Sequence, residues 1–232
     1  MKISIIIPVF NEEKTIAKII RQINNVIGFR KEIIVVDDAS VDGTSGVIKD
    51  ILRLRSGQVK DITVIKHKIN QGKGAAIRTG IAKATGDYVL VQDADLEYDP
   101  QDILSMIKPI SQGKAEVVYG SRFTGPRRNM FFWHWMGNQL LTLITNILYN
   151  TTLSDMETCY KLIPLRLIKS LNLKAQRFEF EPEVTAKILK RNIRIWEVPI
   201  SYAGREYHEG KKITWKDGIP ALWTLIKERI TP

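Results

Sequence analysis

Cysteine and histidine are scarce in this chain of 232 residues. The sequence contains one cysteine, Cys159, and three histidines, His67, His134 and His208. A single cysteine excludes an internal disulfide, and it fits a reducing compartment such as the cytoplasm. The histidines are too scattered along the sequence to suggest a metal cluster or a catalytic triad.

Targeting and low-complexity segments are also missing. Residues 3–7 already have the apolar pattern of a strand, and no basic region, apolar core and cleavage site of a signal peptide precedes them. We find no internal repeat and no flexible linker. The sequence therefore predicts one domain over residues 1–232. Within it, we expect residues 1–122 to bind one substrate and residues 123–232 to contact the second substrate, which accepts the transferred group.

The charge is strongly of one sign. The formal net charge is +10 and the isoelectric point is near 9.6, which indicates an anionic partner such as phosphates or an acidic membrane surface. The lysines and arginines are spread along the chain and are not gathered on one face with aromatic residues, so we do not expect nucleic acid as the partner.

Residues 131–149 contain no charged side chain and follow Arg127 and Arg128. Their length is close to the roughly 20 residues of a spanning helix. However, His134, Asn138 and Thr142 recur at helical spacing and continue the stripe to residues 145–146. This pattern is typical of a helix that lies on a membrane surface, although core packing or a true span stays possible.

The first 120 residues alternate between strand-like and helix-like patterns, which predicts a mostly parallel sheet in an α/β fold, with helices on both faces. The expected strands are 3–9, 33–36, 62–65, 88–91, 117–119 and 193–198, and the expected helices are 12–26, 42–54, 74–84, 131–149, 182–190 and 213–230.

Polar clusters follow several of these strands. Residues 8–12 (PVFNE), 37–40 (DDAS) and 93–95 (DAD) each stand where an expected strand ends. Because the carboxyl ends of parallel strands share one edge, these clusters should converge on one crevice. Paired carboxylates such as Asp93 and Asp95 are suited to Mg²⁺ or Mn²⁺ bound together with substrate phosphates. Taken singly, each cluster is also typical of a turn or a helix cap.

Further segments carry basic or acidic groups. Residues 70–74 (NQGKG) form a glycine-containing loop in which Lys73 is placed to neutralise a phosphate, although the loop lacks the Walker pattern. Residues 120–122 (GSR) and 204–212 supply arginine and lysine, which bind phosphate oxygens. Residues 155–161 (DMETCYK) place Asp155 and Glu157 two apart, either as catalytic carboxylates or as part of a surface turn.

Five motifs, in this order and spacing, resemble the family 2 glycosyltransferases. They are similar in particular to the polyprenyl-phosphate sugar synthases, which include the dolichol-phosphate mannose and glucose synthases. The motifs are residues 8–12, 36–40, 70–74, 93–97 and 120–122. The resemblance is strong up to Arg122 and looser beyond it, and it is not specific for the sugar.

The resemblance implies a GT-A fold and a nucleotide-diphosphate-sugar donor bound with Mg²⁺ or Mn²⁺. It implies a metal site at Asp93, Asp95 and Glu97. The expected donor-binding residues are Pro8, Phe10, Glu12, Asp38, Lys73 and Ala94. The expected phosphate-binding residues are Arg122, Arg205 and Lys211. The expected catalytic residues are Asp93, Asp95, Arg122, Asp155 and Glu157.

The implied reaction is a single displacement with inversion, from GDP-mannose or UDP-glucose to a polyprenyl or dolichyl phosphate at the cytoplasmic membrane face. The chain lacks a clear C-terminal transmembrane pair, so we expect peripheral attachment through helices 131–149 and 213–230. A lipid phosphate needs no strong base, whereas a sugar hydroxyl acceptor would need one, with Asp155 or Glu157 as the candidates. Base, sugar, acceptor and oligomeric state stay open.

Two other classes of protein are weighed against this one. A sugar nucleotidyltransferase would have a glycine-rich basic loop after the first strand, where this chain has residues 8–12 (PVFNE). A non-enzymatic basic module that binds membranes would have its charge on one face, and here the basic patches flank the acidic clusters.

Overall fold

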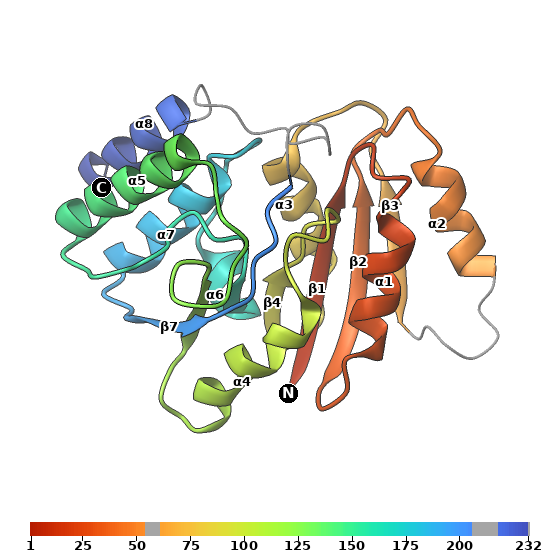
Figure 1. The fold of residues 1–232 in the computed structure, drawn as a ribbon, viewed down its shortest axis with the longest axis horizontal. Helices are drawn as coiled ribbons and strands as arrows, with labels where there is room; N and C mark the ends of the chain where they lie inside the picture. The colour runs from red at the N-terminus through yellow and green to blue at the C-terminus, as the bar shows by residue number, and fades with distance from the viewer. Residues whose placement is uncertain (54–60, 206–217, 232) are drawn as a thin grey trace.

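The computed structural model describes residues 1–53, 61–205 and 218–231 (Figure 1). Within them the chain forms one mixed sheet in the order β3-β2-β1-β4-β6-β5-β7. The strands are β1 (Lys2–Val9), β2 (Arg30–Asp37), β3 (Ile62–Lys66), β4 (Tyr88–Val91), β5 (Val117–Ser121), β6 (Lys161–Pro164) and β7 (Ile195–Pro199).

Helices cover both faces and one end of this sheet (Figure 1). They are α1 (Ile16–Asn25), α2 (Thr44–Arg53), α3 (Lys73–Lys83), α4 (Ile103–Ser111) after the short 3-10 helix η1 (Pro100–Asp102), α5 (Phe132–Tyr149), α6 (Leu165–Ser170), α7 (Phe180–Lys190) and α8 (Gly218–Ile230). Helices α5, α7 and α8 pack together at the end of the sheet away from β3.

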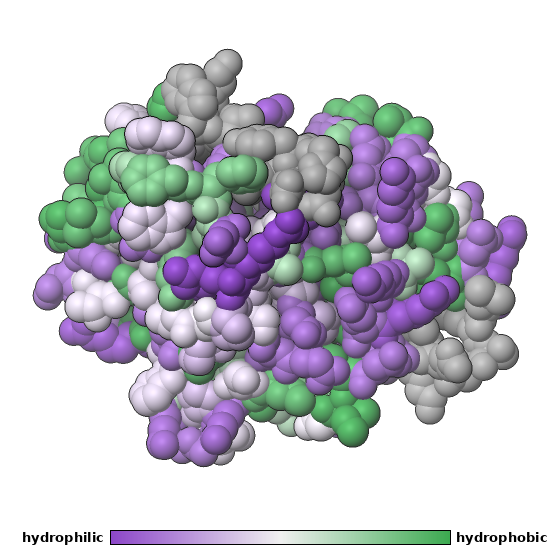
Figure 2. Space-filling view, viewed as in Figure 1, coloured by the Kyte–Doolittle hydropathy of each residue, from purple (hydrophilic) through white to green (hydrophobic). Residues whose placement is uncertain are grey.

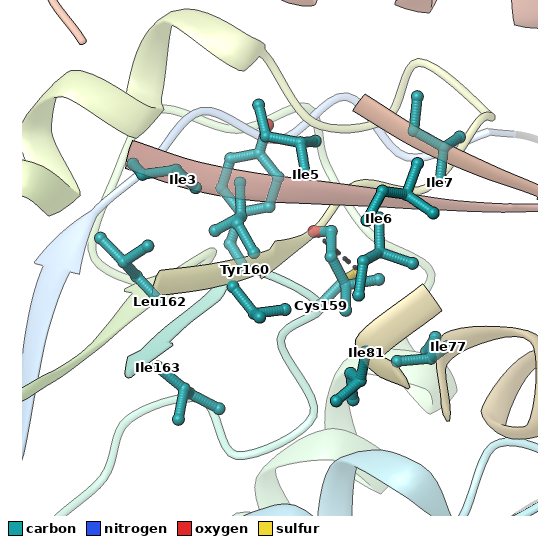
Figure 3. Packing of buried hydrophobic residues seen from close by; sticks show 14 of the residues in the cluster. Ile3, Ile5, Ile6, Ile7, Ile77, Ile81, Cys159, Tyr160, Leu162 and Ile163 are labelled. Carbon is teal, nitrogen blue, oxygen red and sulfur yellow. Dashed lines mark hydrogen bonds between the residues drawn. The ribbon is translucent and has the colours of Figure 1, made fainter. Parts of the chain in front are cut away.

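The centre of the sheet is a run of β-branched residues buried on both faces. Ile5, Ile6 and Ile7 of β1 are fully buried. Figure 3 shows Ile6 directed toward Ile77 and Ile81 of α3, whereas Ile5 and Ile7 lie on the opposite side of the strand. Continuous Ile and Val runs are typical of parallel strands with helices on both faces. The core therefore holds β1 and its neighbour β4 between two layers of helices.

The parallel sheet changes direction of winding between β1 and β4. Strands β1, β2 and β3 follow one another outward, and the chain then returns through α3 to place β4 on the other side of β1. At such a switch point the loops after neighbouring strands diverge and leave a crevice. The polar segments after β1 and β4 lie at this point.

The mostly parallel α/β prediction is confirmed, but several elements differ from the expected ones. Helix α1 begins at Ile16 and not at residue 12, because Asn11 adopts a left-handed conformation with φ of 54° and Glu12 stays in a turn. Helices α4 and α6 and strand β6 were not predicted. Strand β6 is antiparallel to both β4 and β5. Residues 213–217 of the last expected helix lie outside the described residues.

At the amino-terminal edge of the sheet, the Glu32 carboxylate holds three segments together. It accepts hydrogen bonds from Lys2 Nζ at 2.7 Å, from Ser4 Oγ at 2.5 Å, and from the amide and hydroxyl of Thr85 at 2.7 and 2.6 Å. Burial alone would raise the pKa of Glu32, but the bonds from Lys2, Ser4 and Thr85 lower it from 4.5 to about 2.

We predict that Glu32→Gln lowers the free energy of unfolding by about 1–3 kcal/mol at pH 7, since the amide cannot satisfy the same donors. Because the folded-state pKa lies below the unfolded one, the contribution of Glu32 is present above pH 4.5 and is lost as the pH falls toward about 2. Urea unfolding at several pH values measures both effects.

The matched control is Glu116→Gln, which breaks a more exposed ion pair with Arg166 (N–O 3.6 Å). Its effect should stay below about 1 kcal/mol. Equal stability of Glu32→Gln and the natural chain at pH 7 would contradict the prediction.

Candidate active site

A cavity of about 1400 Å³ opens at the carboxyl ends of β1 and β4. Its walls come from the loops after β1, β2 and β4, from Arg122 after β5, and from α5, α7 and α8. Of the residues predicted for the site, the cavity is lined by Pro8, Phe10, Glu12, Asp38, Lys73, Asp93, Ala94, Asp95, Glu97, Arg122, Glu157 and Arg205. Asp155 lies behind this wall, and Lys211 lies outside the described residues. The strand-end clusters therefore converge as predicted.

Arg205 lies among three of the carboxylates. Its Nη2 is 3.3 Å from Asp95 Oδ2 and 3.3 Å from Glu12 Oε1, and its Nε is 3.8 Å from Glu97 Oε1. The Arg205 amide and the Tyr202 hydroxyl also donate to Glu97, at 2.7 and 2.6 Å. The arginine expected at substrate phosphates is thus held by acidic residues that were expected to bind the donor and a metal.

Asp95, at the end of β4, lies close to the carboxylates of Asp93 and Glu97. Burial and the charges of Asp93 and Glu97 raise the pKa of Asp95 to about 7, although Arg205 opposes this rise. A divalent cation fits such a position, because it relieves repulsion between oxygen ligands. In the described part of the chain no three His, Cys, Asp or Glu side chains are spaced as ligands of one ion, so Asp93, Asp95 and Glu97 do not form the preassembled three-residue site that was expected.

Asp38 is held rigidly by the loop that follows β3. Its Oδ1 accepts the Gln71 amide at 2.9 Å and lies 2.6 Å from His67 Nδ1, and its Oδ2 accepts the Gly72 amide at 2.7 Å. His67 Nε2 in turn lies 2.9 Å from Thr79 Oγ1. His67 had no function assigned from the sequence, and the structure makes it a positioning partner of Asp38.

The glycines of residues 70–74 allow close contact with the chain itself. Gly72 has φ of +94°, and a Cβ there would lie 2.4 Å from the carbonyl oxygen of Gln176. A Cβ on Gly74 would lie 2.8 Å from the carbonyl oxygen of Ala175. The loop is therefore packed against residues 175–177, and this contact brings the amino end of α7 to the cavity.

Lys73 is ion-paired on the other side of Asp93. Its Nζ lies 2.9 Å from Asp93 Oδ1 and 3.2 Å from Glu181 Oε1. Glu181 is buried in the first turn of α7 and lines the cavity. Glu181 was not predicted from the sequence, because it follows no expected strand and belongs to none of the five motifs. Its contact with Lys73 depends on the packing of α7 against the 70–74 loop.

Asp155 and Arg122 form a buried, two-pronged ion pair. Arg122 Nε and Nη2 donate to the two oxygens of Asp155, both at 2.7 Å, and the Arg122 amide donates to Oδ2 at 2.9 Å. Arg122 Nη2 also donates to Asn138 Oδ1 of α5 at 3.1 Å. Both oxygens of Asp155 are thus occupied, so its contacts fit a residue that positions Arg122.

Glu157 differs from Asp155 in having an unsatisfied oxygen. Its Oε1 is buried and has no hydrogen-bond partner among the described residues. Burial and the charge of Glu181 raise the pKa of Glu157 to about 7, while Lys161 and Arg122 oppose the rise. Of the two candidate bases named from the sequence, Glu157 has the oxygen available for a ligand or a proton.

Helix α5 turns its polar stripe toward the protein and its apolar side outward. Thr142 is buried, and its hydroxyl accepts a hydrogen bond from the Met156 amide. The Asn146 side chain donates to the Leu153 carbonyl and accepts from the Leu153 amide. The outward face of α5 and α8 (Figure 2) is made of Phe132, Trp133, Leu140, Leu143, Ile147, Ile219, Trp223 and Ile230, each more than half exposed. Within the described residues no helix combines the length and the apolar character needed to cross a bilayer.

The sheet order and the helices that flank it are those of the GT-A fold. The family model described as glycosyl transferase family 2 matches residues 4–171, and the chain belongs to this family.

Two relatives extend the comparison. Over 239 residues the chain is 33% identical to a UDP-N-acetylglucosamine–dolichyl-phosphate N-acetylglucosaminyltransferase of Methanococcus voltae, covering 97% of this chain and 94% of the relative. Over 218 residues it is 26% identical to the dodecaprenyl-phosphate galacturonate synthase of Rhizobium johnstonii, covering 91% of this chain and 62% of the relative.

Among solved structures, the fold is similar to glucosyl-3-phosphoglycerate synthase of Mycobacterium tuberculosis. The TM-score is 0.75 at 21% identity for the complex with Mn²⁺, UDP and glucosyl-3-phosphoglycerate, which covers 100% of this chain and 81% of that one. For the complex with Mg²⁺ and UDP the TM-score is 0.74 at 21% identity, covering 100% and 80%.

We predict that Asp155→Asn lowers the free energy of unfolding by about 3–5 kcal/mol, because it leaves the Arg122 guanidinium buried without its anion. Chemical denaturation at pH 7 measures this loss. In the matched control, Arg166→Gln removes a guanidinium from the exposed pair with Glu116 and should cost less than about 1 kcal/mol. Equal losses in the two variants would show that the buried pair is not the stronger one.

Proposed function

We propose that this chain is an inverting glycosyltransferase that moves a sugar from a nucleotide diphosphate to a polyprenyl phosphate at a membrane surface. The observation that carries the proposal is that one cavity is lined both by charged residues and by apolar residues. Acidic and basic groups around Asp93 and Arg122 line one end, and apolar residues of α5 and α8 line the other, namely Leu140, Leu141, Ile144, Ile219, Ala221 and Leu222.

The donor would lie in the crevice at the carboxyl ends of β1 and β4. Pro8, Phe10 and Asp38 would contact the nucleoside, and Asp93 and Asp95, with Glu97 beside them, would hold Mg²⁺ or Mn²⁺ against the diphosphate. The metal-bound neighbours of the same fold support the choice of ion. UDP is favoured by those neighbours and by the Methanococcus relative, whose donor sugar is N-acetylglucosamine. GDP-mannose and UDP-glucose stay candidates.

The bound cation would supply charge that offsets the diphosphate. Arg205 now pairs with Glu12 and Asp95, and we propose that it turns to the donor phosphates when they arrive. Arg122, held by Asp155, would bind the acceptor phosphate. Removing one such electrostatic group costs roughly 3 kcal/mol of transition-state stabilisation in comparable sites. Lys211 stays a predicted phosphate contact.

The reaction needs no strong base in this arrangement. An oxygen of the acceptor phosphate, already anionic, attacks the anomeric carbon as the bond from that carbon to the diphosphate oxygen breaks, and the nucleoside diphosphate leaves with the electron pair. A sugar hydroxyl as acceptor would have to lose a proton, and Glu157 is then the candidate base.

We predict that the chain with Mn²⁺ transfers sugar from a UDP- or GDP-sugar to a short-chain polyprenyl phosphate, and that Asp95→Asn lowers kcat/KM at least about 100-fold. Product is measured by radiolabelled lipid extraction. The amide keeps the shape of the carboxylate, so a normal melting temperature shows that the fold is intact.

The control for this variant is Glu116→Gln, a charge change outside the cavity that should leave transfer unchanged. Full activity of Asp95→Asn would remove the metal role from this residue. Transfer only to a sugar hydroxyl, with loss of activity in Glu157→Gln, would favour the second acceptor class.

We propose further that the outward face of α5 and α8 rests on the membrane and makes the protein peripheral, on the cytoplasmic side if the single cysteine reflects its compartment. Burying a large apolar side chain stabilises binding by about 1.5–3 kcal/mol, and Arg127 and Arg128 stand directly before α5, where anionic headgroups would lie.

We predict that Trp223→Ala weakens binding to vesicles containing anionic lipid by about tenfold or more in a sedimentation assay. Trp196→Ala is the matched control, since Trp196 is also exposed but lies on β7. Equal effects of the two substitutions would speak against this face as the membrane contact.

A further inference from the structure

Two charged clusters flank Asp93 within the cavity. On one side, Asp95 and Glu97 contact Arg205. On the other side, Lys73 bridges Asp93 and Glu181, and Glu157 lines the same wall. The first cluster is accounted for by the metal and the phosphates. In transfer to a lipid phosphate, neither Glu157 nor Glu181 has yet been assigned a function.

We propose that Glu157 and Glu181 form the subsite of the transferred sugar and make this enzyme selective for neutral sugars over uronic acids. This inference rests on the proposed donor, a nucleotide diphosphate sugar.

The position follows from the connectivity of the donor. The anomeric carbon is joined through one oxygen to the phosphate nearest the sugar, so the sugar must lie beside the residues that hold the diphosphate. Glu181 is separated from Asp93 only by the ammonium group of Lys73, with contacts of 3.2 and 2.9 Å. The nucleoside end of the cavity is built separately, from Pro8, Phe10 and Asp38.

Glu157 needs a hydrogen-bond donor that the described residues do not supply. Its Oε1 is buried without a partner among the described residues, and an unsatisfied buried acceptor is unfavourable. Sugar hydroxyls are donors of the right kind, and a carboxylate accepts them well. Burial, followed by the negative charge of Glu181, raises the pKa of Glu157 to about 7.

The charge balance of this wall disfavours a second anion. Glu181 shares the ammonium of Lys73 with Asp93, and the charges nearest to Glu157 are those of Glu181, Lys161, Arg122 and Asp155. Arg122 is bound to both oxygens of Asp155 and is assigned above to the acceptor phosphate. The Lys161 ammonium is buried behind the wall and donates to backbone carbonyls of Met156 and Thr158. Arg128 and Arg177 line the cavity but are exposed, and Arg205 is paired with Glu12 and Asp95. A uronate carboxylate beside Glu157 and Glu181 would therefore meet mainly repulsion.

The two relatives are named for donor sugars of different charge. The Methanococcus protein is named for N-acetylglucosamine, which is neutral, and the Rhizobium protein for galacturonate, which is an anion. The acidic wall at Glu157 and Glu181 places this chain with the neutral group.

The experiment has two steps, both with Mn²⁺ at pH 8, where Glu157 is largely ionised. Titration calorimetry with UDP and GDP first identifies the nucleotide that binds. Glucose, N-acetylglucosamine and glucuronate diphosphate donors of that nucleotide are then compared. We expect the uronate donor to bind at least about tenfold more weakly than either neutral donor, equivalent to about 1.4 kcal/mol.

Glu157→Gln keeps the shape and a hydrogen-bond acceptor but removes the charge. It should therefore reduce the ratio of neutral-donor affinity to uronate-donor affinity at least about threefold. Glu157→Ala should also weaken the neutral donors. Glu116→Gln, which removes the same charge outside the cavity, should leave the ratio unchanged. Because Glu181→Gln disturbs the Lys73 pair, Glu157→Gln is the primary variant, and circular dichroism checks its fold.

A uronate donor that binds as tightly as the neutral ones, or a ratio that Glu157→Gln does not change, would overturn this subsite while leaving the donor class intact. Failure of both UDP and GDP to bind would overturn the proposed function, and the subsite with it.

Discussion

The mutual repulsion of carboxylates crowded at one sheet edge is the constraint on which this site depends. Burial of β1 and β4 in an isoleucine-rich core fixes where their loops begin, and the carboxylates of Glu12, Asp93, Asp95 and Glu97 are therefore held close together. Arg205 offsets part of the negative charge at Asp95, and Lys73 offsets part of the negative charge at Asp93. Burial, followed by the charges of Asp93 and Glu97, raises the pKa of Asp95 to about 7, and Arg205 opposes the rise. The site is thus built to accept more positive charge, as an ion that accompanies an anionic donor would bring.

The two halves of the sequence share one sheet, and this sharing gives the cavity its mixed character. The loops after β1, β2 and β4 supply most of the acidic groups. The segment beyond Arg122 supplies Glu157, Glu181 and the apolar residues of α5 and α8. Helix α5 joins these parts, because its inner polar stripe contacts Arg122 through Asn138 and the Met156 amide through Thr142. A phosphate group attached to a long apolar chain matches a cavity with these two kinds of lining.

Strand patterns and strand-end clusters were enough to predict the α/β fold and the convergence of Asp93, Asp95 and Asp38 on one crevice. These predictions succeeded because β1, β2 and β4 are continuous apolar runs that end in polar residues. Contacts made across the fold could not be read in this way. Glu181 reaches Lys73 only because α7 packs against the 70–74 loop, and His67 meets Asp38 only through the pairing of β2 with β3. The orientation of α5 was also ambiguous, since a polar stripe can face either solvent or buried polar groups.

The antiparallel direction of β6 has a consequence for how such sites are found. The carboxyl ends of β1 and β4 point to the cavity, so a strand that runs the opposite way between β4 and β5 brings its beginning to the same edge. Glu157 therefore reaches the cavity from before a strand, with Asp155 behind it, whereas Asp38 and Asp93 reach the cavity from after one. A search restricted to the residues that follow strands would pass over Asp155 and Glu157 altogether. In sheets of mixed direction, the polarity of each strand decides which of its two flanks carries the chemistry.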